Sequence, residues 1–203
     1  MHSVATRLAL LGAIFLTAST AGAAPPARVA TAPQHLAKVS GEADAAFAAR
    51  VLSLRDADAH TLAATWNGAR TIFVDFERGG DTESPERPLI ALEETAPSTF
   101  RKLLVTVGET EGGAPDIEAI GFANADRDPA KELIVIFAWR QIHYGACGPI
   151  YEVRIIDGPD PAGTTLRQLP ISKHFGVGCV EKPQRYRFTT IDAVKRELSQ
   201  LGY

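Results

Sequence analysis

The sequence predicts a mainly β fold of the α+β class, an antiparallel sheet system of about seven strands with one N-terminal and one C-terminal helix. Short segments of alternating apolar and polar residues follow one another, separated by turns rich in Gly, Pro and Asp. No helical pattern lies between them, so neighbouring strands are expected to pair in antiparallel fashion. The predicted strands are 71–77, 100–107, 117–123, 132–140, 150–156, 164–169 and 185–189.

The N-terminus has the three parts of a secretory signal peptide. Arg7 precedes an apolar run, 8–16, and the small residues 21–23 follow as an A-x-A-like cleavage site. The run is about half of the roughly 20 residues that a membrane-spanning helix needs. We therefore expect a periplasmic or secreted protein without a membrane span after cleavage. The alternative is a buried N-terminal helix of a cytosolic protein.

The remaining composition is that of one globular domain. Of the 203 residues, 45% are hydrophobic and 22% are charged, and the formal net charge is -3, which disfavours a nucleic-acid partner. The predicted organisation is a signal peptide at 1–23, a flexible Pro-containing leader at 24–39, and a single β-rich domain at 40–203.

Two segments at the ends of this domain have helical spacing. In 42–54, apolar residues recur every three or four positions, which predicts an amphipathic helix. A second helix is expected at 190–201, where Thr189 and Asp192 have capping-box spacing. Between the helices, 133–137 is apolar without interruption, which predicts a central strand covered on both faces.

The chain has two cysteines, Cys147 and Cys179. In an oxidising compartment an even pair is normally a disulfide, so we predict a Cys147–Cys179 bridge. A tetrahedral zinc site is the alternative, because His143 precedes Cys147 by four residues and His174 precedes Cys179 by five.

A loop rich in oxygen side chains comes directly before the central strand. Asn124, Asp126 and Asp128 occupy alternate positions, followed by Ala130 and Glu132. The three side chains, the Ala130 carbonyl and the Glu132 carboxylate could form the oxygen cage that calcium requires. The alternative is a polar turn in which Asn and Asp bond to their own backbone.

This loop resembles the D-x-D-x-D-G-x-x-E-L calcium loop of FG-GAP and VCBS-type β-proteins, in which the loop leads into a strand. The sequence departs from that pattern at Asn124, which stands for the first Asp, and at Pro129, which stands for Gly. If calcium binds as the resemblance implies, an exported module is expected to bind it in the range of about 0.1 to 1 mM.

A segment containing His143, Tyr144, Gly148 and Tyr151 follows the apolar strand, and its last two residues form a G-x-x-Y pattern. With the calcium-type loop before it, this segment is similar to bacterial periplasmic lysozyme-inhibitor proteins over about residues 116–157. The resemblance implies an exposed loop that enters a muramidase cleft, with these four residues as partner contacts. Alternatively, the tyrosines are sheet residues and the glycine belongs to a turn.

The sequence favours a binding protein over an enzyme. It contains no G-x-S-x-G, S-x-x-K or H-E-x-x-H motif and no phosphate-binding glycine loop. Acidic pairs, Asp126 with Glu132 or Glu93 with Glu94, could in principle perform glycoside hydrolysis, so a secreted hydrolase stays an alternative. A second alternative is a structural or accessory envelope protein. The expected partner is an envelope protein such as a lysozyme-like hydrolase.

Overall fold

The computed structural model describes residues 35–55, 58–79, 85–109, 113–140, 148–158, 166–180 and 185–203. These residues belong to one compact unit, 32–203. They form 10 strands and 3 helices in antiparallel sheets, so the predicted fold class is confirmed with more strands than expected. The predicted signal peptide and most of the leader lie outside the described residues, as do His143, Tyr144 and Cys147.

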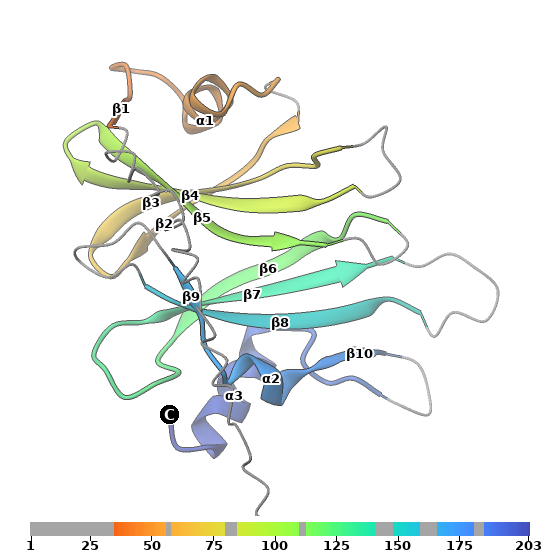
Figure 1. Ribbon diagram of the computed structural model, residues 1–203. Helices are drawn as coiled ribbons and strands as arrows, with labels where there is room; N and C mark the ends of the chain where they lie inside the picture. The colour runs from red at the N-terminus through yellow and green to blue at the C-terminus, as the bar shows by residue number, and fades with distance from the viewer. Residues whose placement is uncertain are drawn as a thin grey trace, which may run out of the picture. The chain divides into compact units, whose positions relative to one another are not determined.

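The first sheet is 5-stranded, in the order β1-β5-β4-β3-β2 (Figure 1). Its strands are β1 (Leu36–Ala37), β2 (His60–Trp66), β3 (Ala69–Asp75), β4 (Arg87–Ala96) and β5 (Thr99–Gly108). Strand β1 pairs with Thr99 and Phe100 of β5. The structure therefore differs from the leader prediction at 36–37, because these residues already belong to the sheet.

The second sheet runs in the order β10-β8-β7-β6, with β9 paired to β8. Its strands are β6 (Asp116–Ala123), β7 (Glu132–Trp139), β8 (Ile150–Asp157), β9 (Arg167–Gln168) and β10 (Val177–Cys179). All 8 residues of β7 are buried, and β7 lies between β6 and β8. This confirms the prediction of a central strand covered on both faces.

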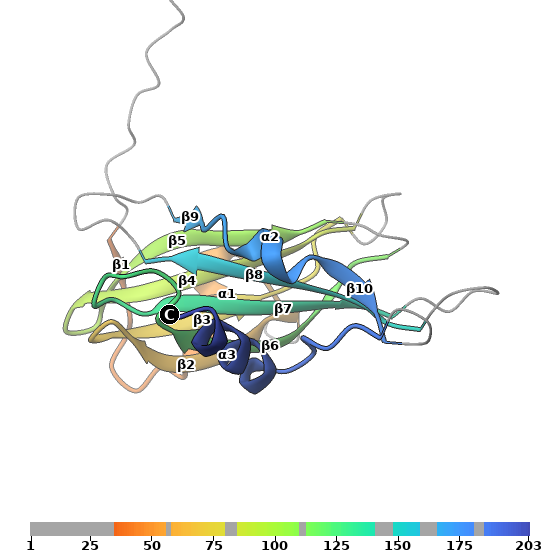
Figure 2. The ribbon, with the colours of Figure 1, turned by 90° about the horizontal axis from the view of Figure 1, so that it is seen from below.

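The two sheets stack face to face as a β-sandwich (Figures 1 and 2). Trp66, Phe73 and Leu103 of the first sheet share one apolar cluster with Leu133 and Phe137 of the second. Burying the inner faces of both sheets in one cluster stabilises the sandwich through the hydrophobic effect.

Helices cover the outer faces of both sheets. Helix α1 (Asp44–Leu52) packs on the first sheet, where the rings of Phe47 and Phe100 lie 4.9 Å apart. Helices α2 (Ser172–Phe175) and α3 (Ile191–Gln200) pack on the second sheet. Gly121 of β6 allows the close approach of α3, because an added Cβ would lie 2.5 Å from the Ile191 side chain.

Both expected helices are present, with a correction at the second N-terminus. The Thr190 hydroxyl accepts a hydrogen bond from the Ala193 N–H at 3.3 Å, so Thr190 is the N-cap and the predicted capping box at Thr189 is wrong. The third helix, α2, was not predicted, and it has only 4 residues. No helix among the described residues is long and apolar enough to span a membrane.

Strands β2 and β4 have no counterpart in the sequence prediction. Strand β2 forms a hairpin with β3 through Asn67 and Gly68, whose φ values of 49° and 86° suit a tight turn between antiparallel strands. Strand β4 is buried without interruption over 87–92. Alternation cannot reveal such a strand, because both of its faces are covered.

The predicted strand at 185–189 is wrong, because these residues form no strand. Tyr186 and Phe188 do face the apolar cluster beneath α2 and α3, which explains the alternating pattern. The edge of the sheet beside β8 is instead taken by β10. The predicted strand at 164–169 is reduced to Arg167–Gln168 among the described residues.

Candidate functional site

The loop between β6 and β7 is held by its own polar side chains. The Asp126 carboxylate accepts the Asp128 N–H at 2.9 Å, and the Asp128 carboxylate accepts the Ala130 N–H at 2.7 Å. The Asn124 side-chain amide donates to the Asp128 carbonyl at 2.5 Å. These are the local bonds of a polar turn, and they hold the loop from within.

The end of this loop is attached to the β2–β3 hairpin of the other sheet. The Lys131 carbonyl accepts the Trp66 indole N–H at 2.6 Å and the Asn67 amide N–H at 3.1 Å. The Lys131 N–H donates to the Asn67 side-chain oxygen at 2.8 Å. Both sheets therefore position the loop.

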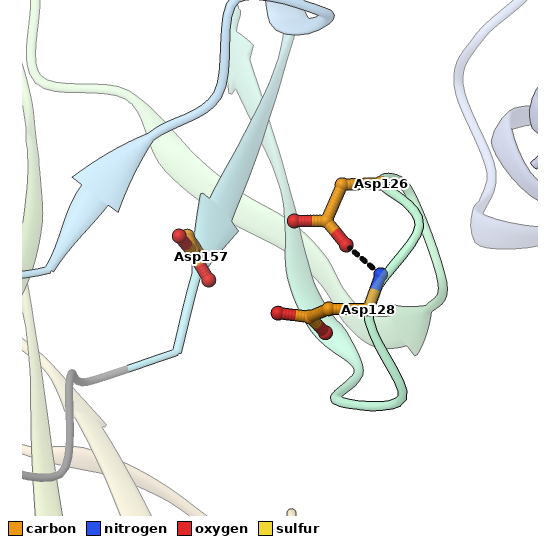
Figure 3. A group of neighbouring side chains, drawn as sticks. All are labelled: Asp126, Asp128 and Asp157. Atoms are coloured by element: carbon orange, nitrogen blue, oxygen red, sulfur yellow. Dashed lines mark hydrogen bonds between the residues drawn. The ribbon is translucent and has the colours of Figure 1, made fainter.

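Three carboxylates meet at this loop. Asp126 and Asp128 come from the loop and Asp157 comes from the end of β8, and ligand oxygens of all three lie within 4.8 Å of one another. Figure 3 shows the carboxylates of the loop and of β8 on facing sides of one small space. Such a group of hard oxygen donors is the chemistry that Ca²⁺ and Mg²⁺ prefer.

Asp157 was missed by sequence reasoning, which considered only the contiguous segment 124–132. The register pairs Leu133 of β7 with Ile156 of β8, so the next residues outward, Glu132 and Asp157, are cross-strand neighbours on the same face. An Asp at the end of the second strand after the loop was the available signal, but its use required the strand register.

Glu132 lies buried beside this group. Its side chain has 0% exposure, and one carboxylate oxygen accepts the Ala125 N–H. Its other oxygen, Oε1, is buried and has no hydrogen-bond partner among the described residues. Burial raises the pKa of Glu132, and the negative charges of Asp126 and Asp128 raise it further.

The donor set fits a divalent cation at Asp126, Asp128 and Asp157. Glu132, on which the charges of Asp126 and Asp128 act, is not one of these three donors, and its Oε1 has no hydrogen-bond partner among the described residues. Of the residues predicted to bind calcium, the structure thus brings together Asp126 and Asp128 and places Glu132 close by. Asn124 and Ala130 use their amide groups within the loop and are not part of the carboxylate group.

One cation of the protein already touches this group. The Arg167 guanidinium on β9 lies 2.7 Å from the Asp157 carboxylate. That hydrogen bond raises the pKa of Arg167, as do the charges of Asp157 and Asp126.

The other predicted sites are only partly described. Gly148 has φ 82° before β8, and Tyr151 is half-buried, with its ring stacked on that of Tyr186 at 6.5 Å. Tyr151 therefore contributes to packing on the outer face of the second sheet. Cys179 is disulfide-bonded; because Cys147 lies outside the described residues, the predicted pairing stays a prediction.

Several alternative sites have other contacts in the structure. The His174 imidazole Nε2 lies 2.8 Å from the Glu197 carboxylate. Glu93 pairs with Arg101 on β5, and its neighbour Glu94 accepts the Ser98 N–H at 2.9 Å. Because adjacent strand residues point to opposite faces, the Glu93 and Glu94 carboxylates do not face one substrate. In the other acidic pair, Asp126 with Glu132, the Glu132 carboxylate is buried and has no access to solvent.

A cavity of about 400 Å³ lies at the other end of β7 and β8. Its lining is partly aromatic and aliphatic and partly charged, formed by Glu109, Trp139, Ile150, Glu152, Arg154 and Val177. The Trp139 indole donates to the Glu109 carbonyl at 2.9 Å. Arg154 lies over the Phe137 ring at 4.9 Å.

Comparison with known proteins adds no family to this description. No family model, no curated protein and no solved structure matches the chain.

Proposed function

We propose that this protein is an exported binding protein of the cell envelope that holds a calcium ion at the β6–β7 loop. The convergence of the Asp126, Asp128 and Asp157 carboxylates within 4.8 Å carries the calcium part of this proposal. Like charges at such distances repel one another, and a bound divalent cation would offset that repulsion. The buried, unpartnered oxygen of Glu132 supports the same conclusion.

The calcium ion would serve structure rather than chemistry. It would supply positive charge and oxygen coordination, joining the loop residues Asp126 and Asp128 to Asp157 at the end of β8. This cross-link would tie a surface loop to the strand beside the central strand β7. A ligand that binds only the folded state raises the free energy of unfolding.

Thermal unfolding with and without calcium tests this part. We expect the Tm to rise between zero and several millimolar Ca²⁺, because the expected Kd is about 0.1 to 1 mM. The variant Asp157→Asn should lose most of this rise, whereas Asp192→Asn, an exposed Asp on α3, should keep it. A wild-type Tm that does not move at several millimolar Ca²⁺ would reject the site.

The proposed partner-binding surface is at the opposite end of the same two strands. Strand β7 leads away from the carboxylates, β8 leads back to them, and each has 8 residues. At about 3.3 Å per residue the two ends are about 25 Å apart. Calcium is therefore proposed to stabilise the strands that carry the partner surface, without touching the partner.

We propose that a lysozyme-like cell-wall hydrolase binds at this end. The segment 143–151, which resembles the recognition loop of the periplasmic lysozyme inhibitors, joins β7 to β8 there. The adjacent cavity offers apolar contact from Trp139, Ile150 and Val177. Val177 is 63% exposed, so it is available to a partner, and buried aromatic and aliphatic contacts contribute most to such interfaces.

Inhibition of a lysozyme-type muramidase by the purified mature protein tests the partner. Val177→Glu should weaken inhibition at least about tenfold, because a charge would have to be desolvated in the contact. Val39→Glu is the matched control, since Val39 is 64% exposed and lies between β1 of the other sheet and α1. Wild-type protein that inhibits no muramidase would reject this partner, and peptidoglycan turnover by the protein alone would support the hydrolase alternative.

A further inference from the structure

We infer that Arg167 competes with the calcium ion for Asp157 and thereby sets the calcium affinity of the loop. This inference rests on the proposed calcium site and adds to it a residue from β9, outside the loop that carries the motif. Without calcium the guanidinium would balance part of the carboxylate charge. With calcium it would have to leave Asp157 or share it with a divalent cation.

The contact between Arg167 and Asp157 is built into the sheet. The two residues are cross-strand partners of β9 and β8, and the guanidinium Nη2 lies 2.7 Å from the Asp157 Oδ2. Cross-strand partners share one face of a sheet. The backbone position of Arg167 is therefore fixed by the strand pairing, which brings its side chain to the carboxylate group.

Exposure allows the arginine to leave. The Arg167 side chain is 70% exposed, whereas the Asp157 side chain is only 22% exposed. An exposed guanidinium can rotate away into solvent at a small free-energy cost, because it is already largely hydrated. The carboxylate it releases would remain in place beside Asp126 and Asp128 for the incoming ion.

The surroundings of Glu132 indicate that Arg167 does not fully take the place of a bound cation. Glu132 has 0% exposure and an Oε1 atom without a partner among the described residues. It lies on the same face as its cross-strand neighbour Asp157, as the pairing of Leu133 with Ile156 requires. Arg167 makes its ion pair with Asp157 and not with Glu132. The buried Glu132 oxygen is therefore left without a positive partner among the described residues. A divalent cation could provide that positive charge.

Arg127 provides a matched control. It is an exposed arginine in the same loop and makes no ion pair with any residue that the structure describes. Replacing either arginine by Gln changes the net charge equally. A difference between the two variants therefore reports the specific contact with Asp157 and not the general field of the protein.

Calorimetric titration with CaCl₂ tests the inference. We expect Arg167→Gln to lower the Kd for calcium about fivefold, which corresponds to about 1 kcal/mol, and Arg127→Gln to lower it less than twofold. Calcium binding by R167Q alone would support the same conclusion. Equal Kd values for wild type and R167Q, or equal tightening in both variants, would overturn the role of Arg167 while leaving the calcium site intact. If neither wild type nor R167Q binds calcium, both the site and the inference fail.

Thermal unfolding gives a second, independent readout. In EDTA, R167Q should have a lower Tm than wild type, because it loses the only positive charge that contacts Asp157 among the described residues. In saturating calcium its Tm gain should exceed that of wild type. A merely structural ion pair would lower the Tm equally in both conditions, and that result would overturn the competition.

Discussion

Arg87 and Glu132 are both charged residues removed from water, but their surroundings are opposite. Arg87 on β4 is 8% exposed and, although its Nε is also buried without a hydrogen-bond partner among the described residues, its guanidinium lies 2.8 Å from Asp75, 3.7 Å from Asp116 and 3.9 Å from Glu77. Glu132 on β7 is 0% exposed, and its carboxylate accepts the Ala125 N–H. The nearby charges that act on Glu132 are negative.

The difference separates a charge that the protein's own carboxylates balance from one for which we propose a cation. A buried ion costs several kcal/mol of desolvation unless opposite charges and hydrogen bonds offset it. The protein supplies that offset for Arg87 from its own carboxylates. It does not do so for Glu132 among the described residues, which is the reason for placing the proposed cation beside Glu132 and not beside Arg87.

The largest expected change in stability comes from removing Arg87, whose charge is balanced by neighbouring carboxylates. Arg87→Met should lower the free energy of unfolding by about 3 kcal/mol, because Asp75 would be left without its buried partner. Urea denaturation measures this. Arg140→Gln is the control: Arg140 lies 2.9 Å from Asp116 but is 66% exposed, so its loss should cost less than about 0.5 kcal/mol. Equal effects would show that burial does not distinguish the two arginines.

A smaller change in stability, of opposite sign, is expected on replacing Glu132, whose charge has no nearby positive partner among the described residues. In EDTA, Glu132→Gln should raise the free energy of unfolding by about 1 kcal/mol, because it removes a buried charge with an unpartnered oxygen. In calcium the same variant should gain less stability than wild type. A loss of stability in EDTA would show that the Glu132 carboxylate is satisfied without a cation.

The pH dependence of this difference has a definite sign. The pKa of Glu132 is raised above 4.5 in the folded protein, so the native state holds its proton more tightly than the unfolded chain does. In EDTA, wild type should therefore lose stability relative to E132Q as pH rises from about 4.5 through the raised pKa. Glu42 has the opposite slope, since the hydrogen bond from Arg50 lowers its pKa to about 2. Comparing wild type with E132Q by urea denaturation at several pH values cancels that contribution; a difference independent of pH would contradict the raised pKa.

The smallest changes in stability are expected on replacing one acidic neighbour of Arg87 or of Glu132. Asp116→Asn removes a carboxylate 3.7 Å from Arg87 and should destabilise the protein by less than about 0.5 kcal/mol. Asp128→Asn keeps the acceptor oxygen for the Ala130 N–H but removes a negative charge near Glu132. In EDTA it should stabilise the protein by a similarly small amount. The same sign for both variants in urea denaturation would remove the distinction between the two sites.

Local patterns predicted those parts of the fold that depend on local chemistry. The apolar run 133–137 predicted the central strand β7, and the periodicity of 42–54 predicted helix α1. The alternation at 185–189 indicated which side chains face the core, but not whether the backbone pairs in a sheet. Strand β4 was missed because a strand covered on both faces over 87–92 does not alternate.

The loop shows the same limit at the level of a site. Alternating Asn and Asp residues predicted a tight turn with converging oxygens, because such side chains bond to nearby backbone groups. Asp126 and Asp128 do so. Asp157 could not be assigned to the group from sequence, since it lies on another strand, and the burial of Glu132 was equally invisible.

The sequence by itself determined the class of the fold, the central strand, the two longer helices and the shape of the acidic loop. Each of these depends on spacing between residues that are close along the chain. Only the tertiary structure decided that Asp157 and Arg167 meet the loop and that Glu132 is sealed from water. Those contacts depend on the register of β7, β8 and β9, and register is set by how whole strands pack against the rest of the molecule.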